Sequence, residues 1–186
     1  DTSPSSQVKP MNQLPQLFTI WNYDDPAETA EKFLALLPQA EAGADRGYHV
    51  ELLTQIARTH SLQRQFAAAH RWLDEAEALL TPGMSVPRMR CLLERGRTYN
   101  SAGEPESARP LFAEAYTLGT AVSPQADFYT IDAAHMMAIV EPTPAEQLKW
   151  NEKALALAKA SANKRAAGWC GSLYNNLGWA YNDKGD

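Results

Sequence analysis

The sequence predicts an all-α fold built from repeated pairs of helices. Apolar residues recur at spacings of three and four, the period of an amphipathic helix, and no useful length of the chain alternates apolar and polar residues as a half-buried strand does. Small and apolar residues also return at steps of about 39 residues over most of the 186-residue chain. Such self-similarity is typical of arrays in which each helix pair buries the apolar stripe of its neighbour.

The stretch that sets the register is residues 174–181, YNNLGWAY. An aromatic residue, a Leu-Gly pair and a tyrosine in this stretch fall on one side of a helix. Glycine inside a helix costs about 0.5–1 kcal/mol relative to alanine. We therefore expect close approach of a second helix at Gly178, with Leu177 and Tyr181 framing the contact.

Earlier copies of the same positions occur along the chain. The three sets are Leu53, Ala57, His60, Ala69, Leu73 and Ala76; Leu92, Gly96, Tyr99, Ala108, Phe112 and Ala115; and Ile131, His135, Ala138, Gln147, Asn151 and Ala154. The last set is the weakest match, because polar residues stand where alanine and a large apolar residue belong. We expect small residues at helix crossings, such as Gly96, to be surrounded by large ones, such as Phe112.

This pattern resembles the tetratricopeptide repeat, in which W-x2-L-G-x2-Y in a first helix is followed by A-x3-F in a second. Tyr174 stands where that family usually has tryptophan, and Gly103 and Gly185 match the glycine that closes the first helix. The step of about 39 residues is longer than that of the standard repeat, as in long-period variants. The resemblance implies a right-handed superhelical solenoid of antiparallel helix pairs, with about four and a half hairpins.

The expected domains are a disordered segment at residues 1–12 and a helical repeat domain at residues 13–186. The expected hairpins span about 14–41, 45–81, 86–122, 124–162 and an incomplete 164–186. Because the last hairpin lacks its second helix, its first helix should expose an apolar face. We expect a fragment of a longer repeat protein, or self-association through this uncapped C-terminal helix.

Four expected details can be checked directly. Leu14–Trp21 should form a short helix, and the helix over Ala27–Leu37 should end or kink at Pro38. Ser107 should cap the second helix of the third hairpin, which places Pro110 in its first turn. Residues 164–184 should form one continuous helix.

Composition narrows the possible functions. With 17 Lys and Arg against 22 Asp and Glu, the net charge is −5, which disfavours nucleic acid as a partner. No apolar run approaches the length of a membrane span, and no signal peptide is visible at the start. Cys91 and Cys170 lack the spacing of a metal or redox motif, so we expect reduced thiols and a cytoplasmic protein.

No motif for catalysis is evident. The Gly-rich phosphate loop, the G-x-S-x-G elbow and the H-E-x-x-H zinc motif are all missing from the sequence. His70 and Asp74 lie one helical turn apart, but no third ligand accompanies them, and His60 takes a core-edge position of the repeat. We expect neither catalytic residues nor a metal or cofactor.

The resemblance implies that first helices line a concave groove that holds a peptide or helix of a partner. The residues expected to face it are Glu51, Thr54, Arg58, Arg90, Leu93, Arg97, Asn100, Tyr129, Asp132, Met136, Ile139, Ser172, Asn175, Trp179 and Asn182. Arginines suit carboxylates, and a tryptophan suits an apolar anchor. We expect an extended ligand with acidic groups near Arg58, Arg90 and Arg97 and an apolar side chain near Trp179. Among these, Arg58, Arg90, Arg97, Asn100, Tyr129, Met136, Asn175 and Trp179 are the candidate site residues.

The leading hypothesis is therefore a non-enzymatic protein-interaction scaffold. An alternative is a sensor or regulatory repeat module of a larger bacterial signalling or transcription regulator, which an output domain beyond Asp186 would favour. RNA binding by a related helical repeat is a weaker third reading, because of the negative charge. The clamp that some family members use for chaperone tails is not reproduced, since Thr54 and Arg58 occupy its first two positions.

Overall fold

The computed structural model describes residues 14–183. Within this range the chain consists of helices and loops and contains no strand, which confirms the all-α prediction for the described residues. None of the described helices has the length and apolar character needed to cross a membrane. The expected disordered segment at residues 1–12 and the expected closing Gly185 lie outside the described residues.

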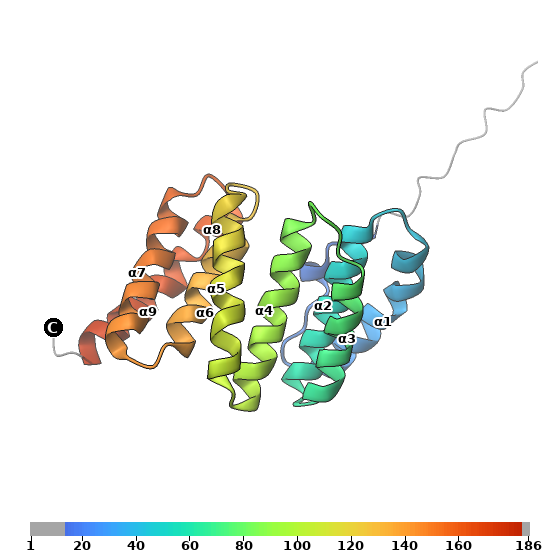
Figure 1. Ribbon diagram of the computed structural model, residues 1–186, viewed down its shortest axis with the longest axis horizontal. Helices are drawn as coiled ribbons and strands as arrows, with labels where there is room; N and C mark the ends of the chain where they lie inside the picture. The colour runs from blue at the N-terminus through green and yellow to red at the C-terminus, as the bar shows by residue number, and fades with distance from the viewer. Residues whose placement is uncertain (1–13, 184–186) are drawn as a thin grey trace, which may run out of the picture.

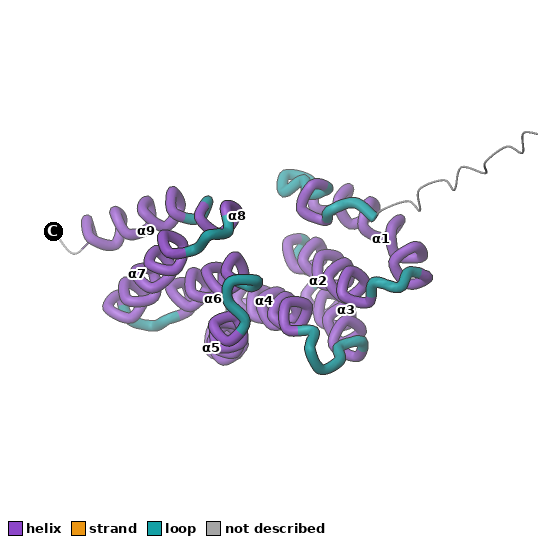
Figure 2. The backbone as a smooth tube through the Cα atoms, turned by 90° about the horizontal axis from the view of Figure 1, so that it is seen from above, coloured by secondary structure: helices purple, strands orange, loops and turns teal. Residues whose placement is uncertain are grey.

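The elements, in chain order, are η1 (Leu17–Thr19), α1 (Pro26–Ala42), α2 (Arg46–Leu62), α3 (Phe66–Ala78), α4 (Ser85–Ala102), α5 (Pro105–Ala121), α6 (Asp127–Val140), α7 (Pro144–Ala160), α8 (Lys164–Ala167) and α9 (Cys170–Asp183). Consecutive long helices pack side by side along the length of the molecule (Figure 1). Seen from above, they follow a curve, with α2, α4 and α6 on its inner side and α3 and α5 on its outer side (Figure 2). The segment before α1 and the short helix α8 both lie on the inner side.

Local sequence explains where several helices begin and end. Asp25, Asp45 and Thr143 precede α1, α2 and α7, and each side chain accepts a hydrogen bond from the backbone N–H three residues later. Gly103 follows α4 with φ of 88°, a left-handed conformation that glycine adopts without steric penalty. The prediction that Gly103 closes this helix is therefore confirmed.

The core repeats the predicted complement of small and large residues. Phe112 of α5 is fully buried, and a Cβ placed on Gly96 of α4 would lie 2.5 Å from its ring. One step earlier, Ala57 and Leu73 are buried in one cluster. One step later, Asn151 of α7 is buried, so the register continues although a polar residue occupies the large apolar position.

The segment before α1 differs from the prediction. Leu14–Trp21 does not form a helix; only the single turn η1 does. Individual contacts hold this segment instead. Leu17 packs in the cluster around Phe33, and the Tyr48 hydroxyl donates a hydrogen bond to the backbone carbonyl of Pro15 over 2.8 Å. Contacts with α2 thus override the weak helical pattern of this segment.

Two expectations about internal prolines differ from the structure: α1 does not end at Pro38, and Ser107 does not cap α5. Helix α1 continues through Pro38 to Ala42, and α5 begins at Pro105 rather than after Ser107, with Pro110 inside it. Pro38 and Pro110 are exposed. The carbonyl four residues before each proline loses its helical donor, but on an exposed face water can replace that donor.

The expected continuous helix after residue 164 is also wrong, because the chain breaks it into α8 and α9 around Trp169. The Trp169 ring lies 6.0 Å from that of Phe128 and 5.3 Å from that of His135, which turns this part of the chain toward α6. On α9, a Cβ at Gly178 would meet no atom within 4 Å. The helix expected to approach Gly178 is therefore not among the described residues.

Candidate functional site

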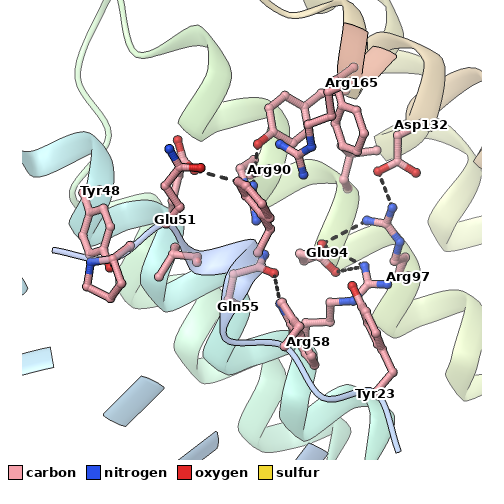
Figure 3. A pocket seen from close by; sticks show the side chains of 18 of the residues that line it. Tyr23, Tyr48, Glu51, Gln55, Arg58, Arg90, Glu94, Arg97, Asp132 and Arg165 are labelled. Carbon is pink, nitrogen blue, oxygen red and sulfur yellow. Dashed lines mark hydrogen bonds and ion pairs between the residues drawn. The ribbon is translucent and has the colours of Figure 1, made fainter. Parts of the chain in front are cut away.

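The inner side of the curve contains a cavity of about 460 Å³, here called the main cavity (Figure 3). Its walls come from the segment before α1, from α2, α4 and α6, and from α8 with the following Trp169. The lining residues are Leu14, Pro15, Gln16, Leu17, Phe18, Trp21, Tyr23, Tyr48, Glu51, Gln55, Arg58, Arg90, Leu93, Glu94, Arg97, Phe128, Tyr129, Asp132, Arg165 and Trp169. Aromatic rings and arginines dominate this list.

One wall is the segment Leu14–Tyr23, which lies against α2. The Trp21 indole N–H donates to the Gln55 side-chain oxygen over 2.8 Å. Trp21 and Tyr23 stack with ring centroids 4.7 Å apart, and the Arg58 guanidinium lies 5.8 Å and 5.6 Å from the two rings. Cation–π contact of this kind favours a fixed position for both aromatic side chains.

The floor of the main cavity is an ion-pair network centred on Glu94 of α4 (Figure 3). Its carboxylate accepts from Arg58 over 3.2 Å and from Arg97 over 3.0 Å, and Arg97 also pairs with Asp132 of α6. Burial acts to raise the pKa of Glu94, but Arg97, Arg58 and Arg90 outweigh it and lower that pKa. Glu94 is therefore a buried, ionised group that joins α2 to α4, and Arg97 extends the link to α6.

Arg90 forms the second charged group of the floor. Its guanidinium donates to the Tyr129 hydroxyl over 2.5 Å and lies 3.5 Å from the Glu51 carboxylate. Burial raises the pKa of Glu51, although Arg90 and, more weakly, Arg165 act in the opposite direction. Arg90 thus also has an anionic neighbour within the protein.

Arg165 enters the cavity from α8 without a carboxylate of the described residues at ion-pair distance, although it interacts with Glu51 electrostatically. Its guanidinium lies 3.8 Å from the ring centroid of Phe128 and 5.0 Å from that of Phe18. Among the described residues, no carboxylate lies within ion-pair distance of it. Sequence reasoning missed Arg165, because the expected continuous helix gave no reason to turn it inward.

The structure brings part of the predicted site together. Arg58, Arg90, Arg97 and Tyr129 line the main cavity, as do Glu51, Leu93 and Asp132. Asn100 and Met136 line a second hollow of about 170 Å³, which shares Arg58, Glu94 and Arg97 with the main cavity. Asn175 and Trp179 are exposed on α9 and line neither space.

Six aromatic residues that line the main cavity were not among the predicted site residues: Phe18, Trp21, Tyr23, Tyr48, Phe128 and Trp169. Phe18 and Trp21 lie in the segment for which the sequence predicts a short helix, and the repeat pattern gives no site role to the other four. Phe18 and Tyr23 are 54% and 62% exposed, unusually open for such large rings. The sequence feature that could have indicated the first three of these site residues is the concentration of aromatic residues just before Asp25, where the first strong helix-start signal occurs.

Other titratable clusters have structural explanations. On the outer side, Arg95 of α4 contacts Asp74 at 2.8 Å, Glu77 at 3.0 Å and the His70 ring at 3.2 Å. Across residues 14–183, no three His, Cys, Asp or Glu side chains gather as a metal site would require. Cys91 is buried, and burial raises the pKa of its thiol to about 12, which disfavours the reactive thiolate.

A further hollow of about 530 Å³ lies between α7 and α9 and is called the α7–α9 hollow. It is lined by Glu152, Leu155, Ala156, Lys159, Tyr174, Leu177, Gly178 and Tyr181. These include the residues whose pattern predicted a covering helix.

No protein-family model matches the chain, and no curated protein matches it either. The resemblance to tetratricopeptide repeats therefore depends on the repeated positions themselves.

Proposed function

We propose that this chain is a tetratricopeptide-like solenoid that acts as a protein-interaction scaffold without catalytic activity. Its inner side would bind a peptide or helical segment of a partner protein. The sequential packing of helix pairs and the inner position of α2, α4 and α6 support this assignment. In a right-handed superhelix of such pairs, first helices share one continuous surface.

The observation that carries the proposal is the segment Leu14–Tyr23 itself. This part of the chain, mostly outside regular helix, lies on the inner side and is held by side chains of α2. Tyr48 hydrogen-bonds a backbone carbonyl of the segment, and Gln55 with Arg58 holds its Trp21 side chain. A surface that holds one extended segment in this way has the chemistry to hold another beside it.

The composition of the inner side suits recognition of a partner. Aromatic residues and arginine are enriched among the residues that contribute most to binding energy at protein interfaces. Phe18 and Tyr23 remain exposed, and the second hollow with Asn100 and Met136 continues from the main cavity. A segment that also reached Asn175 and Trp179 would have to extend beyond both spaces to α9.

The acidic groups of such a partner would meet Arg165 first. Arg58, Arg90 and Arg97 already have carboxylate neighbours within the protein, so an incoming acidic side chain would compete with Glu94, Asp132 or Glu51. The expected contact of an acidic partner therefore changes from Arg58, Arg90 and Arg97 to Arg165, the cavity arginine that forms no ion pair among the described residues.

Selection of a random peptide library on the immobilised chain tests the scaffold proposal. Selected peptides should lose affinity for Asn100→Trp, which fills the second hollow, and should keep it for Thr117→Trp on the exposed side of α5. Equal binding to both variants would place the peptides elsewhere and contradict the proposal. Thermal melts of both variants control for folding.

A sensor or regulatory module of a larger bacterial regulator is the second candidate. The feature that favours it is the main cavity, since a space of this size that combines aromatic walls with charged groups is suited to a small ligand. An output domain encoded next to this segment in the full gene would support this candidate.

A further inference from the structure

We infer that the main cavity binds a small amphipathic carboxylate, with the acid group at Arg165 and the apolar body among the neighbouring rings. This goes beyond the scaffold proposal, because the ligand is a small molecule that occupies the main cavity itself rather than a peptide that extends into the second hollow. The inference uses charge balance, unmet hydrogen-bond donors, and the size and lining of the cavity.

The charges of the cavity do not balance. Glu94 and Asp132 compensate Arg58 and Arg97, and Glu51 lies beside Arg90. This leaves Arg165, which faces aromatic rings and has no carboxylate within ion-pair distance among residues 14–183. Glu51, which lies beside Arg90, also interacts with Arg165 electrostatically, so these two arginines share one carboxylate. A guanidinium stacked on a ring keeps its N–H donors free at its edge, where a carboxylate can accept two of them.

The unmet hydrogen bonds point to the same chemistry. The Nε of Arg58 and the indole Nε1 of Trp169 are buried without an acceptor among the described residues, and both side chains line the cavity. Both atoms are donors, as is the Arg165 guanidinium. A ligand that contributes oxygen acceptors therefore fits, whereas an amine would add donors to a site that already has an excess of them.

The size and lining of the cavity favour a compact ligand. A volume of about 460 Å³ lies within the range of roughly 300–1,000 Å³ that is usual for small-molecule sites. The segment Leu14–Tyr23 lines the α2 side of the space, and Trp169 lines the α8 side. Phe18, Phe128 and Trp169 form apolar surfaces close to Arg165, so the acid group and the apolar body of one molecule can be satisfied together.

Calorimetric titration of the whole chain tests the inference. The probes are octanoate and phenylacetate, with the neutral octanamide and phenylacetamide as matched controls. We expect saturable binding of at least one acid, about tenfold or more tighter than its amide, because the charge-assisted contact is lost in the amide. Arg165→Gln should abolish this preference and Arg165→Lys should keep part of it.

Arg71→Gln is the matched control, since Arg71 is exposed on α3 and does not line the cavity. It should bind the acids as the wild type does, and all variants should keep the wild-type melting temperature. The inference is overturned if neither acid binds at millimolar concentration, if the amides bind equally, or if Arg71→Gln loses as much affinity as Arg165→Gln.

A blocked tetrapeptide, acetyl-Ala-Phe-Glu-Ala-amide, separates the two proposals. It carries the same carboxylate and ring on a peptide backbone. Binding of the free acids with loss in Arg165→Gln supports the small-ligand site even if no library peptide is selected. Binding of the tetrapeptide without binding of either acid overturns the small-ligand site and leaves the scaffold proposal standing.

Discussion

Alanine at Gly96 is the perturbation whose result the structure defines most closely. The added Cβ would lie 2.5, 2.7 and 2.9 Å from three atoms of the Phe112 ring. The ring is fully buried in a cluster with Ala108, Ala115 and Met137, so it has little room to move. Overpacking of this kind costs about 1–3 kcal/mol, and the better helix propensity of alanine offsets about 0.5–1 kcal/mol of it. We expect a net loss of stability of about 1–2 kcal/mol.

Gly178 is the matched control, because it takes the same position in the repeat pattern 82 residues later. A Cβ there would meet no atom within 4 Å. Only the propensity term remains, so Gly178→Ala should raise the stability of α9 by about 0.5–1 kcal/mol. The same substitution at two equivalent positions is thus expected to have opposite signs.

Urea denaturation followed by circular dichroism measures both effects. The double variant Gly96→Ala with Phe112→Leu tests the cause, because a smaller side chain makes room for the Cβ. It should be less destabilised than the sum of the two single variants. If Gly96→Ala and Gly178→Ala change the unfolding free energy by the same amount, or if the double variant is additive, the proposed contact with Phe112 is not responsible.

Three further predictions concern the core, the charged floor and the C-terminal face. Phe112→Ala should destabilise by about 3–5 kcal/mol through the cavity it leaves, and a urea midpoint close to that of wild type would contradict its core position. Burial acts to raise the pKa of Glu94, but Arg97 and Arg58 lower it below the ordinary value of 4.5. The ionised carboxylate therefore stabilises the folded state above pH 4.5, and this contribution is lost as the pH falls through the lower pKa of the folded state. Glu94→Gln should therefore lose less unfolding free energy on acidification than wild type, and parallel curves would refute this. Ala156→Arg, in the α7–α9 hollow, should weaken self-association in sedimentation velocity, whereas a wild type that stays monomeric at all concentrations would contradict the association itself.

The repeated core was predictable because its determinants are local. Small and large residues that meet across one helix pair, such as Gly96 and Phe112, lie 16 residues apart in the chain and recur with the helices. The effect of the prolines was not predictable in the same way. Whether Pro38 ends a helix depends on whether the carbonyl it leaves unpaired faces water, and that depends on packing elsewhere.

The candidate site was predictable only where it belongs to the repeat. Arg58 and Arg97 occupy first-helix positions next to the core pattern, and the pattern indicated that they share one side. Their compensation by Glu94 was not expected, because an acidic residue of a helix carries no sign of which neighbours it will meet. Arg165 and Phe18 lie in the short helical turns α8 and η1, which are too short for a period to indicate a direction, and their meeting across the cavity depends on the whole curve.

The shared floor links the two proposals physically. The main cavity and the second hollow share three lining residues, Arg58, Glu94 and Arg97. A ligand in either space therefore contacts the same ion pairs. Binding linkage is reciprocal: if octanoate changes the affinity of a selected peptide, the peptide must change that of octanoate by the same factor. Paired calorimetric titrations, each with the other ligand at saturation, measure both factors. The Glu94 carboxylate pairs with both Arg58 and Arg97. We therefore expect each ligand to change the affinity of the other by a factor clearly different from one, and we expect this factor to become one in Glu94→Gln. Two independent affinities in the wild type would show that the floor does not couple the spaces.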